Sequence, residues 1–188
     1  MNQHKISERL LQLAQNDLKV RERLMRNDQL IGGYHPEMEK VHRENAAALR
    51  QIIKEIGFPG ISKVGTEASE AAWLIAQHAI AEPAFMKLFF ELMTENSWDI
   101  NKKHWAYLND RILYFQGKPQ RFGTQLNADG SIYPVMDIEQ VNALRLEYDL
   151  LVIPPEDLKR IAKIEEIERI ENENPDYVMW RDRVGWKT

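Results

Sequence analysis

The segment of residues 66–80 constrains the fold more than any other part of the chain. Placed on a helix at about 100° per residue, its alanines, isoleucines and tryptophan cover most of the circumference. One narrow arc holds its polar side chains, Glu67, Glu70, Gln77 and His78. Because alanine side chains are small, they let the backbones of neighbouring helices approach closely. We therefore expect this helix near the centre of the fold, covered by other helices.

Apolar spacing and Gly/Pro punctuation place the other helices. The first 27 residues read as a helix, and a second runs to Ile56, where Gly57 and Pro59 end it. The remaining helices are expected from Glu82 through Met93, from about Asn101 to Phe115, after Asp137 through Leu146, and from about Glu156 to Glu171. The chain is therefore predicted to be mainly α.

A different pattern follows the helix that ends near Phe115. Gly117 to Gln125 has no helical period, and a turn signal at Asn127–Gly130 separates two short segments. This arrangement predicts one small β-hairpin near residues 121–135. We expect a single helical core domain over residues 1–154, followed by a C-terminal helix and docking tail over residues 155–188.

The expected C-terminal helix has an unusual apolar stripe. Its apolar residues recur every three positions, whereas an α-helix turns once every ~3.6 residues, so the stripe winds backwards around the helix. The tail adds further large apolar side chains, Tyr177, Met179, Trp180, Val184 and Trp186. The tail either folds back over its own domain, leaving a monomer, or crosses to a second copy and forms a homodimer.

Composition excludes several classes of function. The chain has 25 Lys+Arg, 29 Asp+Glu and no cysteine, so it carries no disulfide scaffold, thiol nucleophile or thiolate zinc site. Its mild acidity lacks the basic stripe typical of nucleic-acid binding. No apolar run is long enough to span a membrane, and the charged N-terminus does not resemble a secretory signal. We expect a soluble, cytoplasmic protein that binds neither nucleic acid nor a membrane.

The histidines show no spacing typical of a metal site on one helix. Such a site places ligands at i and i+4, but His35 and His42 are seven residues apart with a loop between them. His78 and Glu67 share a face but are eleven residues apart. A metal would need ligands gathered from different helices, which one sequence does not reveal. We therefore expect neither a metal nor another cofactor.

Several polar residues on helices are candidates for acid–base chemistry or ligand binding. A neutral imidazole such as His78 can donate or accept a proton near pH 7, although a lone histidine on an apolar helix is more often structural. Asp110 and Arg111 are adjacent and diverge by about 100°, so one could bind a ligand while the other braces a neighbour. His42 and Asn45 lie one turn apart and either share a pocket or cap a surface.

The loop from Gly117 to Gln125 is a candidate binding segment. It carries hydrogen-bonding groups that include Gln120, Thr124 and Gln125, and functional residues are concentrated on loops held by rigid elements. It is not a phosphate-binding Walker loop, which needs a different glycine spacing before a helix. The alternative is a helix end followed by an ordinary hairpin.

Separated motifs in a fixed order resemble a known family. They are Val64–Gly65, the stretch Ala71–Ala79 with Gln77-His78-Ala79, then Asn109-Asp110-Arg111, Gly117–Gln125 with Gly123-Thr124-Gln125, and Pro134–Asp137. Over most of the chain this series is similar to a bacterial family known only as a domain of unknown function. Asp17, Arg21 and Asn45 also match. His42 stands where that family often has Asp, Phe122 replaces its Tyr, and Tyr148–Leu150 lacks its usual Gly.

The family has no established activity, so the resemblance implies no mechanism. It implies that the polar residues of these motifs belong to one shared site: His78, Asp110, Arg111, Gln120, Thr124 and Gln125.

The first functional hypothesis is a small, metal-independent hydrolase or group transferase acting on a polar, anionic small molecule or nucleotide-like substrate. In it His78 transfers a proton, Asp110 orients His78 or a water, and Arg111 binds an anionic group through its two-pronged guanidinium. The substrate's polar edges would contact Gln120, Thr124, Gln125 and Asn45. The second hypothesis is a non-catalytic ligand-binding or protein-interaction module in which the same polar cluster is structural.

Overall fold

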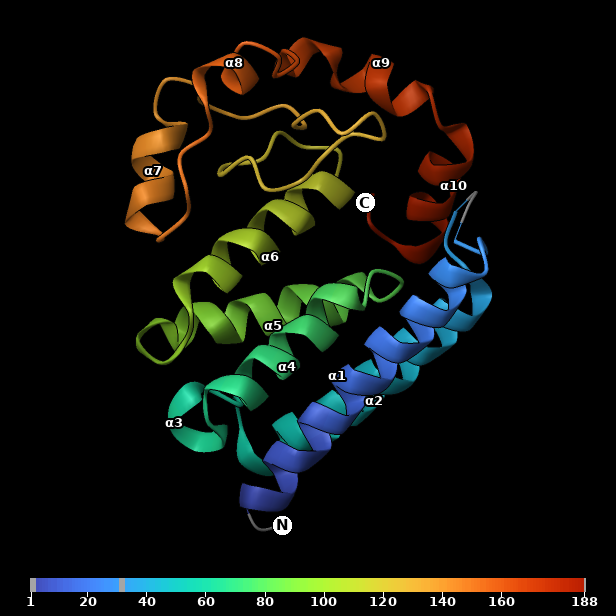
Figure 1. The fold of residues 1–188 in the computed structure, drawn as a ribbon, viewed down its shortest axis with the longest axis vertical. Helices are drawn as coiled ribbons and strands as arrows, with labels where there is room; N and C mark the ends of the chain where they lie inside the picture. The colour runs from blue at the N-terminus through green and yellow to red at the C-terminus, as the bar shows by residue number, and fades with distance from the viewer. Residues whose placement is uncertain (1–2, 31–32, 188) are drawn as a thin grey trace. The chain divides into compact units, whose positions relative to one another are not determined.

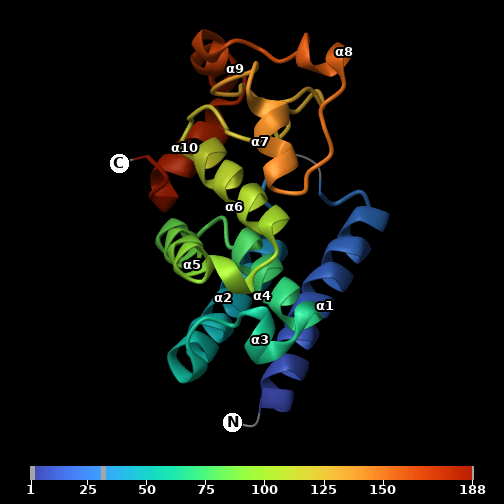
Figure 2. The ribbon, with the colours of Figure 1, turned by 90° about the vertical axis from the view of Figure 1, so that its left-hand side faces the viewer.

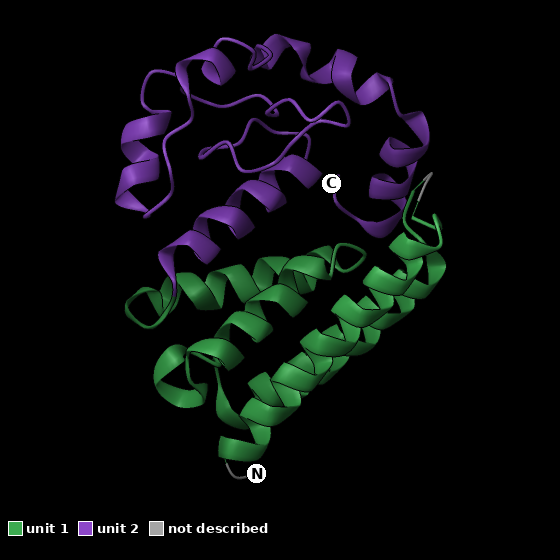
Figure 3. Cartoon of the chain, in the orientation of Figure 1, with its two compact units in different colours: residues 1–100 green, residues 101–188 purple. Residues whose placement is uncertain are grey.

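The structure is a computed structural model that describes residues 3–30 and 33–187. It is mainly α-helical, as predicted (Figure 1). The chain divides into two compact units, unit 1 over residues 1–100 and unit 2 over residues 101–188 (Figure 3). The domain boundary expected at residue 154 therefore falls inside unit 2. Among the helices of the described residues, none has the length and apolar character that a membrane span requires.

Unit 1 is built on two long helices that lie side by side, α1 (Gln3–Arg26) and α2 (Pro36–Ile56) (Figure 1). The loop between them was expected from sequence, and its residues 31–32 lie outside the described part of the chain. The remaining helices of the unit are α3 (Ile61–Val64), α4 (Thr66–His78) and α5 (Pro83–Glu95), followed by a short 3-10 turn (Ser97–Asp99).

Helix α4 is the central helix of unit 1, which confirms the prediction from its alanines. It packs against α1, α2, α3 and α5. Ala72 and Ala76 are fully buried, and Ala68, Ala71 and Ile75 are nearly so. Because the alanine side chains are small, α1 and α2 pack close to α4, and side chains on α1 and α2 can reach its C-terminal end. The helix ends at His78, two residues earlier than expected.

The short helix α3 was missed by the sequence reading because a single turn has no detectable period. Its position depends on Asp99, whose carboxylate accepts hydrogen bonds from the Ser62 backbone N–H and hydroxyl, both at 2.8 Å. The approach is so close that a Cβ on Gly60 would lie 2.1 Å from an Asp99 carboxylate oxygen. Any side chain at residue 60 would therefore displace the Asp99 carboxylate from Ser62.

Unit 2 begins with α6 (Lys102–Phe115), which is followed by a long loop and by α7 (Val141–Glu147). Beyond them the chain forms α8 (Pro155–Leu158), a 3-10 turn (Ile164–Glu166), α9 (Ile167–Asn172) and α10 (Pro175–Val184). In Figures 1 and 2, α8, α9 and α10 follow one another around the loop that connects α6 to α7.

The predicted β-hairpin near residues 121–135 is wrong. Only isolated bridges occur among the described residues, Gln120 with Val135 and Leu126 with Ile132. The physical reason is that side chains take the backbone donors that a ladder would use. The backbone N–H groups of residues 121, 122 and 124 donate to Asp110, and that of residue 125 donates to the Gln120 side chain.

The single helix expected over residues 156–171 is also wrong. The chain breaks after α8 and resumes as a 3-10 turn and α9. A repeat of three suits the 3-10 geometry of residues 164–166 and does not keep an α-helix on one surface. Ile161 and Ile167 are buried, whereas Ile164 is 41% exposed. Two of these isoleucines thus pack inside the unit while the third is exposed, although they lie on separate short segments and not on one helix.

The tail forms α10 and docks within unit 2. Trp186 is 1% exposed and stacks on Phe115, with ring centroids 5.0 Å apart. Arg181 donates to the carbonyls of Tyr114 and Phe115 at the end of α6. These contacts are those of the self-docking alternative. The homodimer through the C-terminal segment stays a prediction.

Candidate functional site

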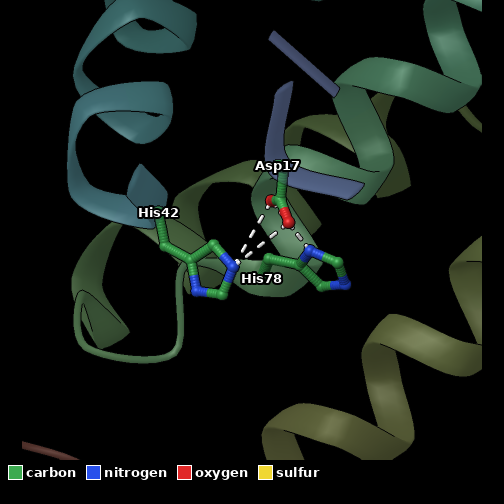
Figure 4. A group of neighbouring side chains, drawn as sticks. All are labelled: Asp17, His42 and His78. Atoms are coloured by element: carbon green, nitrogen blue, oxygen red, sulfur yellow. Dashed lines mark hydrogen bonds and ion pairs between the residues drawn. The ribbon is translucent and has the colours of Figure 1, made fainter. Parts of the chain in front are cut away.

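Three helices of unit 1 each contribute one side chain to a buried polar cluster. Asp17 comes from α1, His42 from α2 and His78 from the last residue of α4 (Figure 4). We call this group the Asp17 cluster. Close packing of the alanine-rich α4 against α1 allows the short Asp17 side chain to reach His78.

The three side chains converge on the Asp17 carboxylate. His78 Nδ1 lies 2.9 Å from Asp17 Oδ2, and His42 Nε2 lies 3.4 Å from each carboxylate oxygen. The two imidazole rings are close to each other, with centroids 5.1 Å apart. One potential ligand atom from each residue can be chosen so that all three lie within 4.8 Å of one another.

The Asp17 cluster is buried, so the negative charge of its carboxylate is poorly solvated by water. Asp17 is fully buried, while the side chains of His42 and His78 are 10% and 17% exposed. Burial acts to raise the pKa of Asp17, but hydrogen bonds and charge from the two histidines outweigh it and hold that pKa far below its usual range. A buried carboxylate needs a compensating cation, which is either a protonated imidazole or a metal ion.

A fourth residue, Tyr34, contacts the outer nitrogen of one imidazole. Its hydroxyl lies 2.6 Å from His42 Nδ1. If Tyr34 donates, the His42 proton resides on Nε2 and faces Asp17. If a neutral His42 donates from Nδ1 to Tyr34, its Nε2 turns a lone pair toward the carboxylate, an arrangement that is stable only with a cation between them. Metal-binding histidines in proteins commonly have such an outer partner.

The distances within the Asp17 cluster suit a shared metal ion. A metal about 2.0–2.2 Å from each nitrogen and oxygen ligand separates neighbouring ligand atoms by about 3.0–3.5 Å. The spacings from Asp17 to His78 and to His42, 2.9 and 3.4 Å, are close to that range. The three residues therefore could hold a divalent ion after small side-chain adjustments.

Asn45, expected as a binding residue, lies one turn after His42 and is 3% exposed. Its side-chain amide donates to the Leu13 carbonyl at 3.3 Å, which connects α2 to α1. This contact gives Asn45 a structural role beside the Asp17 cluster.

The other expected site residues lie in unit 2, where Asp110 organises the loop. Its carboxylate accepts hydrogen bonds from the backbone N–H groups of Arg121, Phe122 and Thr124 and from the Thr124 hydroxyl, all at 2.8–3.1 Å. Burial raises the pKa of Asp110 against the opposing effect of these donors. The sequence predicts that Asp110 orients His78 or a water, whereas the carboxylate that contacts His78 in unit 1 is that of Asp17.

Gln120 completes this loop network. It is fully buried, its amide nitrogen donates to the carbonyls of Gln125 and Tyr133, and its oxygen accepts from the Gln125 backbone. Arg111 Nη1 lies 3.2 Å from Gln125 Oε1, and the Gln125 amide donates to the Thr124 hydroxyl. Each of these expected binding residues is thus engaged in holding the loop.

The structure therefore brings the expected residues together in two groups. His78 and Asn45 belong to unit 1, whereas Asp110, Arg111, Gln120, Thr124 and Gln125 form one network in unit 2. The single shared site that the family resemblance implies would include residues of both units, and it stays a prediction.

Asp17 and Tyr34 were missed as site residues, and His42 was named only as an open alternative. A signal was present for Asp17, which lies on the buried stripe of α1 with Leu10, Ala14 and Leu24. His42 likewise falls on the buried stripe of α2, between Met38 and Leu49. A polar residue at a core position of two neighbouring helices is the pattern that could have identified the cluster.

Comparison with known proteins places the chain in a family without assigning it an activity. No curated protein and no solved structure matches it. A family model described as a family of unknown function, DUF6624, matches residues 5–166, which includes the Asp17 cluster and the Asp110 network. The chain therefore belongs to this family of unknown function.

Proposed function

We propose that the chain is a small metal-dependent hydrolase or group transferase whose centre is the Asp17 cluster. The observation that carries the proposal is the convergence of three metal-ligand side chains from three helices on one fully buried carboxylate. Three protein ligands leave coordination positions open for water and substrate, which is the arrangement of catalytic rather than structural metal sites. This proposal replaces the metal-independent enzyme expected from the sequence.

The ligand set favours a first-row divalent ion such as Zn²⁺. Two imidazoles and a carboxylate suit zinc and iron, whereas magnesium and calcium prefer oxygen ligands alone. A bound ion of this kind lowers the pKa of its water toward ~7 and so supplies hydroxide near neutral pH. An open metal position also attracts oxyanions, which keeps a polar, anionic small molecule as the proposed substrate class.

One observation favours a second candidate, proton transfer by His78 without a metal. The 2.9 Å contact with Asp17 orients the imidazole, and Figure 4 shows its other ring nitrogen directed away from the carboxylate. A carboxylate that orients a histidine in this way is the arrangement used in catalytic triads. The two candidates differ in one measurable property, the binding of a metal ion.

Calorimetric titration of chelator-treated protein with Zn²⁺ tests the proposal. We expect one ion per chain, with at least a 100-fold weaker affinity in Asp17→Asn and His78→Gln. The matched control is His4→Gln, because His4 is exposed on α1, where its ring lies 3.6 Å from Glu8. Circular dichroism establishes that each variant is folded.

Absence of zinc binding would contradict the metal proposal and leave the proton-transfer candidate. Equal binding by wild type, Asp17→Asn and His78→Gln would place the ion elsewhere and also contradict it.

A further inference from the structure

Unit 2 contains a cavity of about 1330 Å³ that the proposed metal centre does not use. Its lining comes from the loop at residues 126–133, from residues 157–163, and from α9 and α10. Figure 1 shows the ribbon of α8, α9 and α10 passing around that loop. Small-molecule sites in proteins typically measure about 300–1,000 Å³, so this cavity has room for a ligand of that class and ordered water.

The lining includes a buried tyrosine whose hydroxyl is not satisfied. Tyr133 is 2% exposed, and its hydroxyl has no hydrogen-bond partner among the described residues. Burial, together with the charge of Glu171, raises the pKa of Tyr133, so the group remains a neutral donor. A buried hydroxyl without a partner destabilises the fold, and an acceptor on a bound molecule would remove that cost.

A second donor in the lining is Arg181, which is 1% exposed. Its Nη1 donates to the carbonyls of Tyr114 and Phe115, and its Nη2 forms an ion pair with Glu171 at 2.6 Å. Its Nε has no acceptor among the described residues. Tyr133 and Arg181 therefore present buried donors that require acceptors.

The other walls of the cavity carry aromatic side chains and charged side chains of both signs. Tyr114 and Tyr177 line it, with the Tyr114 ring 4.8 Å from that of Tyr133. Five carboxylates also line it. Four of them pair with arginines, and the fifth, that of Asp129, accepts hydrogen bonds from Ser131. Two lysines of the lining, Lys159 and Lys163, are exposed and form no ion pair within the described chain. The cavity thus combines flat aromatic surfaces, two buried donors without acceptors and two lysines that lie outside the ion pairs of the described residues.

From this combination we infer that the cavity of unit 2 binds a planar aromatic small molecule that carries an oxyanion. The ring would contact the tyrosines, and the oxyanion would accept hydrogen bonds from Tyr133 and Arg181 or pair with the lysines. This site is independent of the Asp17 cluster, because all of its residues lie in unit 2.

Binding of two probes, adenosine 5′-monophosphate and 1-naphthoate, tests the inference by calorimetry on the full chain. The uncharged counterparts are adenosine and 1-naphthalenemethanol. We expect the anions to bind at least 10-fold more tightly than these counterparts. In Tyr133→Phe the affinity for at least one anion should fall about 5- to 10-fold while the melting temperature of the free protein rises, because an unsatisfied hydroxyl is removed.

Tyr148→Phe is the matched control, since Tyr148 packs beside Trp105 and Phe122 and does not line the cavity. It should leave probe affinity unchanged. The Lys159→Gln/Lys163→Gln double variant, which keeps the cavity intact, should weaken the anions and not their uncharged counterparts.

The same titration in Asp17→Asn separates this site from the metal centre. Probe binding should persist there even though zinc binding is lost. The inference is overturned if neither anion binds at millimolar concentration, if Tyr133→Phe and the double lysine variant both bind like wild type, or if binding disappears with Asp17.

Discussion

Asp17 in unit 1 and Asp110 in unit 2 are both fully buried, yet their surroundings differ in kind. Asp110 accepts hydrogen bonds from backbone N–H groups and a hydroxyl of one loop, which are neutral and do not titrate near neutral pH. Asp17 faces two imidazoles, which can exchange protons or bind a metal. The comparison teaches that burial of a carboxylate alone does not indicate chemistry; the nature of its partners does.

The largest expected effect is the loss of stability in Asp110→Ala. Removing this carboxylate leaves three backbone donors and the Thr124 hydroxyl unsatisfied, so the free energy of unfolding should fall by about 3–5 kcal/mol. Urea denaturation measures it. The control is Asp137→Ala, because Asp137 accepts from the backbone of Glu139 and Gln140 in an exposed turn and should cost about 1 kcal/mol or less. Equal losses of stability in Asp110→Ala and Asp137→Ala would contradict the special role of Asp110 in holding its loop.

The next effect concerns stabilisation by zinc. At 100 times the dissociation constant, Zn²⁺ should raise the free energy of unfolding by about 2.7 kcal/mol, because it binds only the folded chain. The increment should vanish in Asp17→Asn and persist in Asp110→Asn. Thermal melts with and without zinc measure it, and loss of the increment in Asp110→Asn alone would reverse our assignment.

A smaller effect is expected from Tyr34→Phe. The hydroxyl contacts His42 Nδ1 at 2.6 Å, and removal of such outer partners typically costs 10-fold or more in metal affinity. We expect about a 10-fold weaker zinc affinity, equivalent to about 1.4 kcal/mol, by calorimetry. Unchanged affinity would show that Tyr34 does not support the site.

The smallest expected effect is a change in the stability of the metal-free protein as the pH falls. The histidines hold the pKa of Asp17 below its usual value near 4, so its ionised form stabilises the fold above that value. This contribution is lost as the pH falls below about 4. Urea denaturation from pH 7 to pH 3 should therefore show a steeper decline for wild type than for Asp17→Asn. Parallel curves would contradict the assigned pKa.

Local periodicity predicted the helical part of the fold well. The central position of α4 followed from its alanines, and the end of α2 followed from Gly57. The hairpin was wrong because the partners of the loop's N–H groups reside on α6, at a distance along the chain that no local pattern reveals. The helix breaks after α8, in a segment whose apolar residues recur every three positions, a spacing that does not match an α-helix.

The candidate site was harder to predict than the fold. His78 was identified as a potential acid–base residue, but its partners Asp17 and His42 are 61 and 36 positions away in sequence. Their convergence depends on the packing of α1 and α2 against α4. The sequence alone shows a polar residue on the apolar stripe of α1 and another on that of α2. This pattern indicates buried polar groups but does not identify their partners.

X-ray absorption at the zinc edge of the loaded, full-length chain tests the metal centre most directly. The account predicts nitrogen and oxygen ligands at about 2.0–2.2 Å and the outer-shell scattering of two imidazoles. In His42→Gln, scattering from one imidazole should be lost. A spectrum without imidazole scattering, or one that is identical in wild type and His42→Gln, would contradict the assignment of Asp17, His42 and His78 as the ligands.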